Sequence, residues 1–301
     1  MKKLNFVAFL PKALMISAAI MVVGILCNVI FGTQMDISFK GGTQIRYSYT
    51  DEIDLDKVTE IAEKHLGDDV KVQEDELNGA KIVTLSKAGE TDIEEVEPKL
   101  TADLEKEGLE FQTSDSLSAS KGTKFLLRCL LALGLAAILL IVYVGFRFRK
   151  IGGVSAGVSA LIALIHDLLI VYFAFVIFGL ELNDNFVAVM LTILGYSLND
   201  TIVIFDRVRT LRRRSSAPLA DVVNESLHNV LRRTIITTVT TCLAISAVLV
   251  VALVMHVDAV VSFALPMLLG AISGSYSSLF LSGPIWVRWM NRKAAKEAAQ
   301  A

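Results

Sequence analysis

The chain has 301 residues, a net charge of −2 and a mean hydropathy of +0.57. Its apolar fraction of 53%, counted without glycine, exceeds the roughly 45–50% that soluble domains reach with glycine included. These values exclude an ordinary soluble globule, a disordered chain, a collagen-like chain and a disulfide scaffold. Residues 32–121 carry 22 acidic and 10 basic residues, a net charge of −12, whereas the remainder carries 9 and 19, a net charge of +10. An acidic block therefore interrupts a basic, apolar chain.

The first predicted element is an apolar helix over residues 13–31, which is long enough to cross the roughly 30 Å core of a bilayer. Lysines precede it, as in a signal peptide, but residues 32–36 lack a small-x-small cleavage pattern. We therefore expect an uncleaved transmembrane helix, and we assign residues 1–31 to a cytoplasmic N-terminus followed by this helix.

The acidic block, residues 32–124, has the pattern of a small α+β domain. Alternation over 44–50 predicts a strand, and an apolar stripe over 54–65 predicts a helix that Asp54 caps. Two strands over 70–73 and 81–86 with a turn near Asn78-Gly79, a helix from residue 91 to about 107 and a strand over 109–113 follow. The order β-α-β-β-α-β is that of a ferredoxin-like fold. Residues 114–124 are expected to form a polar connector.

Five further apolar runs over residues 125–146, 152–180, 186–205, 234–255 and 259–286 predict transmembrane helices two to six. A basic tail over 287–301 follows. Lysine and arginine are concentrated in alternate flanks of the six helices, and such residues mark the cytoplasmic side. We therefore expect a multi-pass protein of the cell membrane, with both termini cytoplasmic and residues 32–124 extracytoplasmic.

Charges inside these spans are the main candidates for function, because a charge at mid-bilayer costs about 2.5–3.5 kcal/mol even on the mildest scale. Asp200, between Asn199 and Thr201, lies about five residues, or roughly 8 Å, from the end of span four. Its carboxylate should face other helices, where it suits a proton relay; the alternative is a polar anchor between helices.

Arg233 opens span five, with Thr237 one turn further on. Because Asp200 and Arg233 both lie in the cytoplasmic parts of their spans, we expect an ion pair whose opening favours proton uptake. The alternative is an ordinary cytoplasmic flanking arginine. Asp206, near the end of span four, is a supporting polar residue that either pairs there or extends to the membrane surface.

Asp167, in the middle of span three, is the third relay candidate. Its neighbour His166 has two interpretations: histidine is a residue type that can change charge near neutral pH, or this one is a core side chain whose hydrogen bonds are satisfied. Adjacent residues point about 100° apart on a helix, so the two are not expected to pair. The three cysteines lie in apolar runs without metal-ligand spacing, so neither a metal site nor a cofactor is expected.

Two GxxxG patterns predict close helix contacts. One consists of Gly153 and Gly157, and the other of Gly270 and Gly274. Serines 273, 275, 277 and 278 extend the second pattern. Small side chains of this kind favour tight packing and sliding of one helix along another.

Four segments together resemble the SecD/SecF family of protein-export membrane subunits, which belongs to the RND superfamily. The resemblance covers essentially the whole chain. It implies an RND-type bundle of six helices, and the small outer domain is more similar to the SecF-type members than to the SecD-type members. The resemblance rests on residues 36–43 (DISFKGGT), 161–167 (LIALIHD), 195–207 (GYSLNDTIVIFDR) and 231–238 (LRRTIITT).

The resemblance implies an auxiliary, non-enzymatic subunit of the Sec translocase that acts with SecD late in protein export and uses the proton motive force. Implied partners are SecD, the SecYEG channel, the translocating preprotein, a YidC-type insertase, YajC and the lipid bilayer, with no nucleic acid. The family's proposed proton-path residues fall on Asp200 and Arg233, with Asp167 beside them. Its motif at the base of the outer domain falls on Asp36, Gly41, Gly42 and Thr43.

The sequence also admits other functions. The main one is an RND-type exporter of small molecules or lipids, although such proteins carry twelve spans and larger outer domains. An aspartyl protease built on Asp167 and Asp200 is disfavoured, because the two differ in depth and no Gly-x-Gly-Asp motif occurs. A third alternative is a membrane-anchored binding module. Such a module would have no role for the charged residues inside the membrane.

Overall fold

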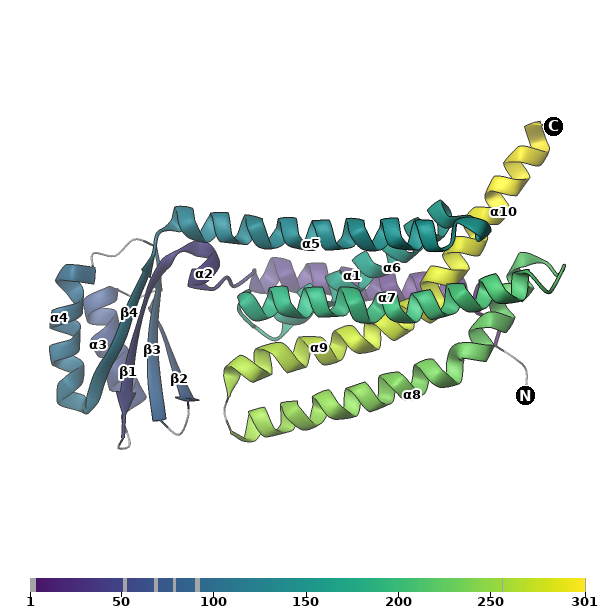
Figure 1. The fold of residues 1–301 in the computed structure, drawn as a ribbon. Helices are drawn as coiled ribbons and strands as arrows, with labels where there is room; N and C mark the ends of the chain where they lie inside the picture. The colour runs from purple at the N-terminus through teal and green to yellow at the C-terminus, as the bar shows by residue number, and fades with distance from the viewer. Residues whose placement is uncertain are drawn as a thin grey trace.

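The structure is a computed structural model that describes residues 4–50, 53–67, 70–77, 80–89, 93–255 and 257–300. A small α+β domain lies at one end of a bundle of long helices (Figure 1). In the described part of the chain, six helices are long and apolar enough to cross a membrane. They span Phe6–Phe31, Ser120–Arg147, Gly153–Ile177, Asp184–Arg212, Leu219–Val254 and Asp258–Gln300. The expected fold class, a six-span helical membrane protein with a small α+β domain, is confirmed.

The bundle is organised around its two most buried members, α6 (Gly153–Ile177) and α7 (Asp184–Arg212). The outer members α1 (Phe6–Phe31), α5 (Ala119–Arg147) and α8 (Leu219–Val254) expose many apolar side chains. Such exposure suits a helix whose outer face meets lipid rather than water. α7 and α8 extend beyond their apolar runs, to Arg212 and from Leu219, because polar and amphipathic residues continue the helices there.

The sixth span is not one straight helix. It consists of α9 (Asp258–Ser277), a π-helical turn η3 (Ser278–Ser282) and α10 (Gly283–Gln300). A π turn followed by a proline is a common cause of a change in helix direction, and Pro284 stands directly after this turn. Figure 1 shows α10 leaving the bundle at a steeper angle than α9.

The α+β domain contains one antiparallel sheet. Its elements are β1 (Gly42–Tyr49), α3 (Leu55–Leu66), β2 (Val70–Leu77), β3 (Ala80–Ala88), α4 (Ile93–Leu104) with the 3-10 turn η1 (Glu105–Glu107), and β4 (Leu109–Leu117). The strand order β2-β3-β1-β4 is that of the ferredoxin-like fold. Helices α3 and α4 lie on one face of the sheet (Figure 1), and apolar residues of both layers form its core. This arrangement agrees with the order predicted from the sequence.

Two details of this domain differ from the expectation or lie outside the described residues. The last strand continues to Leu117 and α5 begins at Ala119, so the polar connector expected over residues 114–124 is wrong. The reason is non-local, because residues 113–117 pair with the first half of β1. The turn near Asn78-Gly79 and the start of the helix at residue 91 lie outside the described residues.

Candidate functional site

Asp167 forms the centre of a polar cluster inside the bundle. It lies on α6 and is completely buried. Its carboxylate accepts hydrogen bonds from the hydroxyl groups of Ser197 on α7 and of Ser273 and Ser277 on α9, each at 2.6 Å. His166 Nδ1 lies 3.1 Å from Asp167 Oδ1. Both carboxyl oxygens are therefore satisfied, and three helices meet at one buried carboxyl group.

The contact between His166 and Asp167 contradicts the expectation that these neighbours do not pair. Their Cα–Cβ bonds diverge on the helix, but the imidazole ring extends along the helix far enough to bring Nδ1 back to the carboxylate. The other ring nitrogen, Nε2, is buried and has no hydrogen-bond partner in the described residues.

A second set of hydroxyl groups continues the polar cluster toward Asp200. The Ser278 hydroxyl lies 3.0 Å from the Thr201 hydroxyl and donates to the carbonyl oxygen of Ser197 at 3.2 Å. Thr201 and Ser278 are both buried. Thr201 follows Asp200 directly on α7, so these hydroxyl groups lie between Asp167 and the part of α7 that carries Asp200.

The hydrogen bonding of Asp200 differs from that of Asp167. Its side chain is buried, with 8% exposure, but its Oδ2 atom has no hydrogen-bond partner in the described residues. Arg233 on α8 is near enough for its positive charge to act on this carboxylate, yet the expected ion pair between them is not formed among the described salt bridges. A buried carboxylate with an unsatisfied oxygen retains the capacity to take up a proton or a cation.

Several polar side chains of α7 and α8 near this aspartate are exposed, beside exposed apolar residues such as Ile236. Asn199 on α7 and Arg233 and Thr237 on α8 are all exposed. The Thr237 hydroxyl donates only to backbone carbonyl oxygens of its own helix. Polar side chains that face hydrocarbon are costly, so these residues are candidates for contact with other polar or protein groups.

Asp206 lies one to two turns beyond Asp200 and forms ion pairs with two arginines. Its Oδ1 atom accepts hydrogen bonds from Arg147 on α5 at 3.0 Å and from Arg209 at 2.8 Å. Of the two alternatives for this residue, pairing is the one observed. The Nε group of the adjacent Arg207 is buried without a hydrogen-bond partner in the described residues.

The predicted glycine patterns lie at close helix contacts. A Cβ atom on Gly153 would lie 2.0 Å from the carbonyl oxygen of Gly145 on α5, and one on Gly270 would lie 2.7 Å from Ile193 on α7. The other two members are less tightly enclosed. At Gly274 the nearest atom, in Ser197, would lie at 3.0 Å, and at Gly157 the nearest, a backbone oxygen of α5, at 3.4 Å.

Residues 36–43 join the α+β domain to the bundle. The Asp36 carboxylate accepts hydrogen bonds from the backbone and hydroxyl groups of Ser38 and so caps the short helix α2 (Ile37–Lys40). Gly41 follows at φ +77°, and Gly42 at φ +152° leaves no room for a Cβ, which would lie 2.2 Å from the carbonyl oxygen of Lys87. Thr43 is buried as β1 begins, and its hydroxyl has no hydrogen-bond partner in the described residues.

Phe39 of α2 is inserted into the bundle. It is 2% exposed, and its ring centroid lies 5.7 Å from that of Phe125 on α5. A second contact is polar, because the Lys71 ammonium group on β2 donates to Gln34 at 3.1 Å and pairs with Glu181 in the α6–α7 loop. The base of the α+β domain therefore touches three separate parts of the bundle.

The charges of the α+β domain form surface pairs rather than a reaction centre. The pKa of Asp103 is lowered to about 2, first by a hydrogen bond from Lys106 and then by one from His65. Burial raises the pKa of Tyr47 in the core of the domain. None of these groups is arranged around a cavity that the structure describes.

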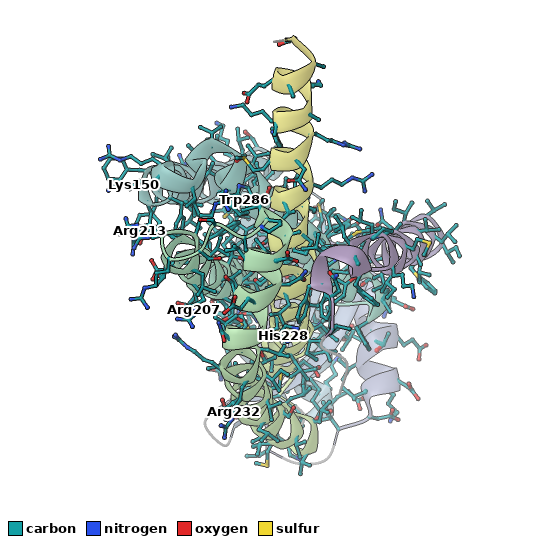
Figure 2. The ribbon with its side chains drawn as sticks, turned by 90° about the vertical axis from the view of Figure 1, so that its right-hand side faces the viewer. Lys150, Arg207, Arg213, His228, Arg232 and Trp286 are labelled. Carbon is teal, nitrogen blue, oxygen red and sulfur yellow. The ribbon has the colours of Figure 1, made fainter. Side chains whose placement is uncertain are left out.

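The opposite end of the bundle is basic. Figure 2 views this end, where Lys150, Arg207, Arg213 and Arg232 project from different helices and connections. Figure 1 places both chain termini at the same end. Within the described residues, no group of three or more His, Cys, Asp or Glu side chains is suited to hold a metal ion.

Sequence reasoning missed the donors to Asp167. Ser197 was not singled out, and Ser273 and Ser277 were interpreted as small packing residues. Their spacing carried a usable signal, because positions 273 and 277 lie on the same face of a helix as Gly270 and Gly274. The sequence also did not identify Arg147 as the partner of Asp206 from another helix.

Together these features define a class: a six-span membrane protein that carries an α+β domain at one end and buried carboxylates between its helices. Residues 96–292 match the family described as "Protein export membrane protein SecD/SecF, C-terminal". The chain belongs to the SecD/SecF family.

Relatives of known name extend this match to nearly the whole chain. The protein translocase subunit SecF of Alicyclobacillus acidocaldarius is 31% identical, over 94% of this chain and 91% of that protein. The SecF subunit of Rhodothermus marinus is also 31% identical, over 97% and 94%. These relatives are named as translocase subunits and not as enzymes.

Fused SecDF proteins match over part of their length. The SecDF subunit of Bacillus subtilis is 29% identical over 94% of this chain, which spans 38% of that protein. The crystal structure of SecDF from Thermus thermophilus, described as a translocon-associated membrane protein, superposes with a TM-score of 0.79. The superposition covers 96% of this chain and 39% of the SecDF chain, at 24% sequence identity. This similarity supports the fold described above.

Proposed function

We propose that the chain is the SecF-type auxiliary subunit of the Sec protein translocase, which acts with SecD and uses the proton motive force late in protein export. The observation that carries the proposal is Asp200, a buried intramembrane carboxylate with one unsatisfied oxygen that lies within the electrostatic influence of the exposed Arg233. The proposed orientation places both termini in the cytoplasm and residues 32–124 outside.

Proton exchange at Asp200 changes the charge between α7 and α8. The ionised carboxylate attracts Arg233, and protonation removes that attraction. Asp167, whose carboxyl group accepts from three serine hydroxyl groups, keeps α6, α7 and α9 together. One charge that crosses 100 mV is worth about 2.3 kcal/mol, enough to bias two helix arrangements of similar energy.

Rigid elements connect the α+β domain to the helices that move. Only Ser118 separates β4 from α5, and α5 packs along α6 through the Gly153 contact. Phe39 adds a second connection into the bundle. A shift of the helices is therefore transmitted to the α+β domain, which acts on the translocating preprotein outside the membrane.

The exposed polar face of α7 and α8 is where SecD binds. Asn199, Arg233 and Thr237 require a cover within the bilayer, and transmembrane helices of SecD supply it. The SecYEG channel, a YidC-type insertase and YajC are further partners in the proposed assembly.

The proposal is tested by complementation and crosslinking. The chain, expressed in cells that lack their own SecF, is expected to restore signal-peptide cleavage of a secreted protein. In a variant whose three native cysteines are replaced by serine, a cysteine at position 199 should crosslink to SecD. A matched cysteine at Leu135, exposed on α5, should not. Failure to restore export, or equal crosslinking at both positions, contradicts the proposal.

A further inference from the structure

A cleft lies between α1 and α10, where α10 leaves the bundle. Its volume is about 630 Å³. One part of its lining is apolar and comes from Leu10, Leu14 and Ile285, and the other part is basic and comes from α10. The basic residues include Arg288, Arg292 and Lys296.

The fold itself creates this cleft. The π turn and Pro284 turn α10 away from the direction of α9 (Figure 1), so that α10 diverges from the first turns of α1. Pro284 and Val287 at the base of α10 are buried against neighbouring elements, whereas residues 291–300 are all exposed. The opening between the two helices therefore lies at the basic end of the bundle.

Three of the four basic residues that line the cleft lack an ion-pair partner in the described residues. Arg288, Arg292 and Lys296 follow one another at intervals of four residues on one face of α10, where like charges repel. In the described residues none of the three forms an ion pair or a side-chain hydrogen bond; Lys293 has a long contact of 3.8 Å with Glu297. An anion bound between the three residues relieves this repulsion.

The position of the cleft identifies the kind of anion. Trp289 lines it and is 42% exposed, and tryptophan is enriched where a membrane surface meets water. Leu10 and Leu14 of the first span form much of the apolar part, together with Ile285 of α10. A ligand that fits has an anionic head and an apolar tail.

We infer that this cleft binds an anionic phospholipid such as phosphatidylglycerol, with its phosphate group between Arg288, Arg292 and Lys296 and an acyl chain against Leu10 and Leu14. Basic pockets between helices at the cytoplasmic surface suit such headgroups. The inference rests on the proposed orientation, which places α10 at the cytoplasmic surface. It assigns to the basic tail a lipid site in addition to its role in setting topology.

The two tryptophans of the chain allow a direct test. Trp286 is buried at 1% exposure, whereas Trp289 faces the cleft. The full chain is placed in phosphatidylcholine vesicles that contain a small fraction of either phosphatidylglycerol or phosphatidylcholine brominated near the headgroup end of the acyl chain. Quenching of tryptophan fluorescence is measured, and a Trp289→Phe variant gives the background from Trp286.

Brominated phosphatidylglycerol is expected to quench at a lower fraction than brominated phosphatidylcholine. The variant Arg292→Gln/Lys296→Gln should lose this preference by about fivefold for each charge removed. The matched control Arg213→Gln/Arg214→Gln removes two exposed charges from the α7–α8 loop and should retain the preference.

Equal quenching by the two lipids overturns the inference, as does an equal loss in the cleft variant and the loop control. Loss of the preference in millimolar inorganic phosphate at constant ionic strength also overturns it, because a free anion then suffices. The assay needs neither SecD nor a proton gradient, so its failure is distinct from a failure to restore export.

Discussion

Replacing Asp167 by asparagine removes a negative charge at the point where donors from two other helices converge on α6. The carboxylate accepts from three serine hydroxyl groups at 2.6 Å, two of them on α9. An amide has nearly the same shape, and a serine hydroxyl can accept as well as donate. The substitution therefore keeps the packing and converts charge-assisted hydrogen bonds into neutral ones.

The expected cost follows from that change. A hydrogen bond to a charged group contributes about 1.5–3 kcal/mol and a neutral one about 1 kcal/mol, and interhelical bonds in membranes average about 0.6 kcal/mol. Three converted bonds therefore lower the free energy of unfolding by about 2–3 kcal/mol. Asp200→Asn serves as the matched comparison. Because one oxygen of Asp200 is already unsatisfied, its substitution should change stability by less than about 1 kcal/mol.

Unfolding of the full chain in mild detergent, titrated with a denaturing detergent and followed by circular dichroism, measures both variants under the same conditions. We expect Asp167→Asn to unfold at a lower fraction of denaturing detergent than the unsubstituted chain, and Asp200→Asn to unfold near it. If Asp200→Asn is as destabilising as Asp167→Asn, the distinction between a fixed anion and an exchangeable carboxylate is wrong.

Three further predictions concern the rest of the molecule. Gly153→Ala should force α5 away from α6 and cost about 1–3 kcal/mol in the same unfolding assay, whereas Gly134→Ala, whose Cβ meets nothing within 4 Å, should not; equal effects would contradict the close contact. Because the pKa of Asp103 is about 2 in the folded protein and about 3.9 in unfolded chains, its stabilising effect is present above pH 4 and is lost as the pH falls toward 2. Asp103→Asn should remove that part of the acid sensitivity in thermal unfolding, and an unchanged pH profile would count against it. Lys71→Gln should release the contact with Glu181 and speed amide exchange in β2, with at most about 1 kcal/mol of global effect; unchanged exchange rates would refute this contact as a restraint.

Much of the architecture could be predicted because its signals are local. Apolar runs of about 20 residues identify the six spans, and alternation within seven residues identifies β1. The extent of β4 could not be predicted in this way, because residues 113–117 are polar and become a strand only by pairing with the first half of β1. The ends of α7 and α8 were not predicted either. Hydropathy identifies the residues that lie in the bilayer, whereas these helices continue into polar residues outside it.

The site was predictable in part. Burial of Asp167 and Asp200 follows from the cost of charge in hydrocarbon. The difference between them does not, because it depends on which serines of α9 face α6. Ser273 and Ser277 donate to Asp167, whereas Ser275, on the same helix, contacts Thr238 on α8. Only the packing of the helices assigns each hydroxyl to its partner.

The measurement that tests proton coupling at Asp200 most directly is late-stage export with and without a proton gradient. Membrane vesicles that contain the complete translocase with this chain as its SecF subunit are loaded with a partly translocated preprotein, and completion of export is followed by protease protection. We predict that Asp200→Asn keeps the export seen without a gradient and loses the increase that the gradient gives, whereas Asp200→Glu, which retains an exchangeable carboxyl group, keeps part of that increase. A gradient-dependent increase in Asp200→Asn equal to that of the unsubstituted chain would contradict the account.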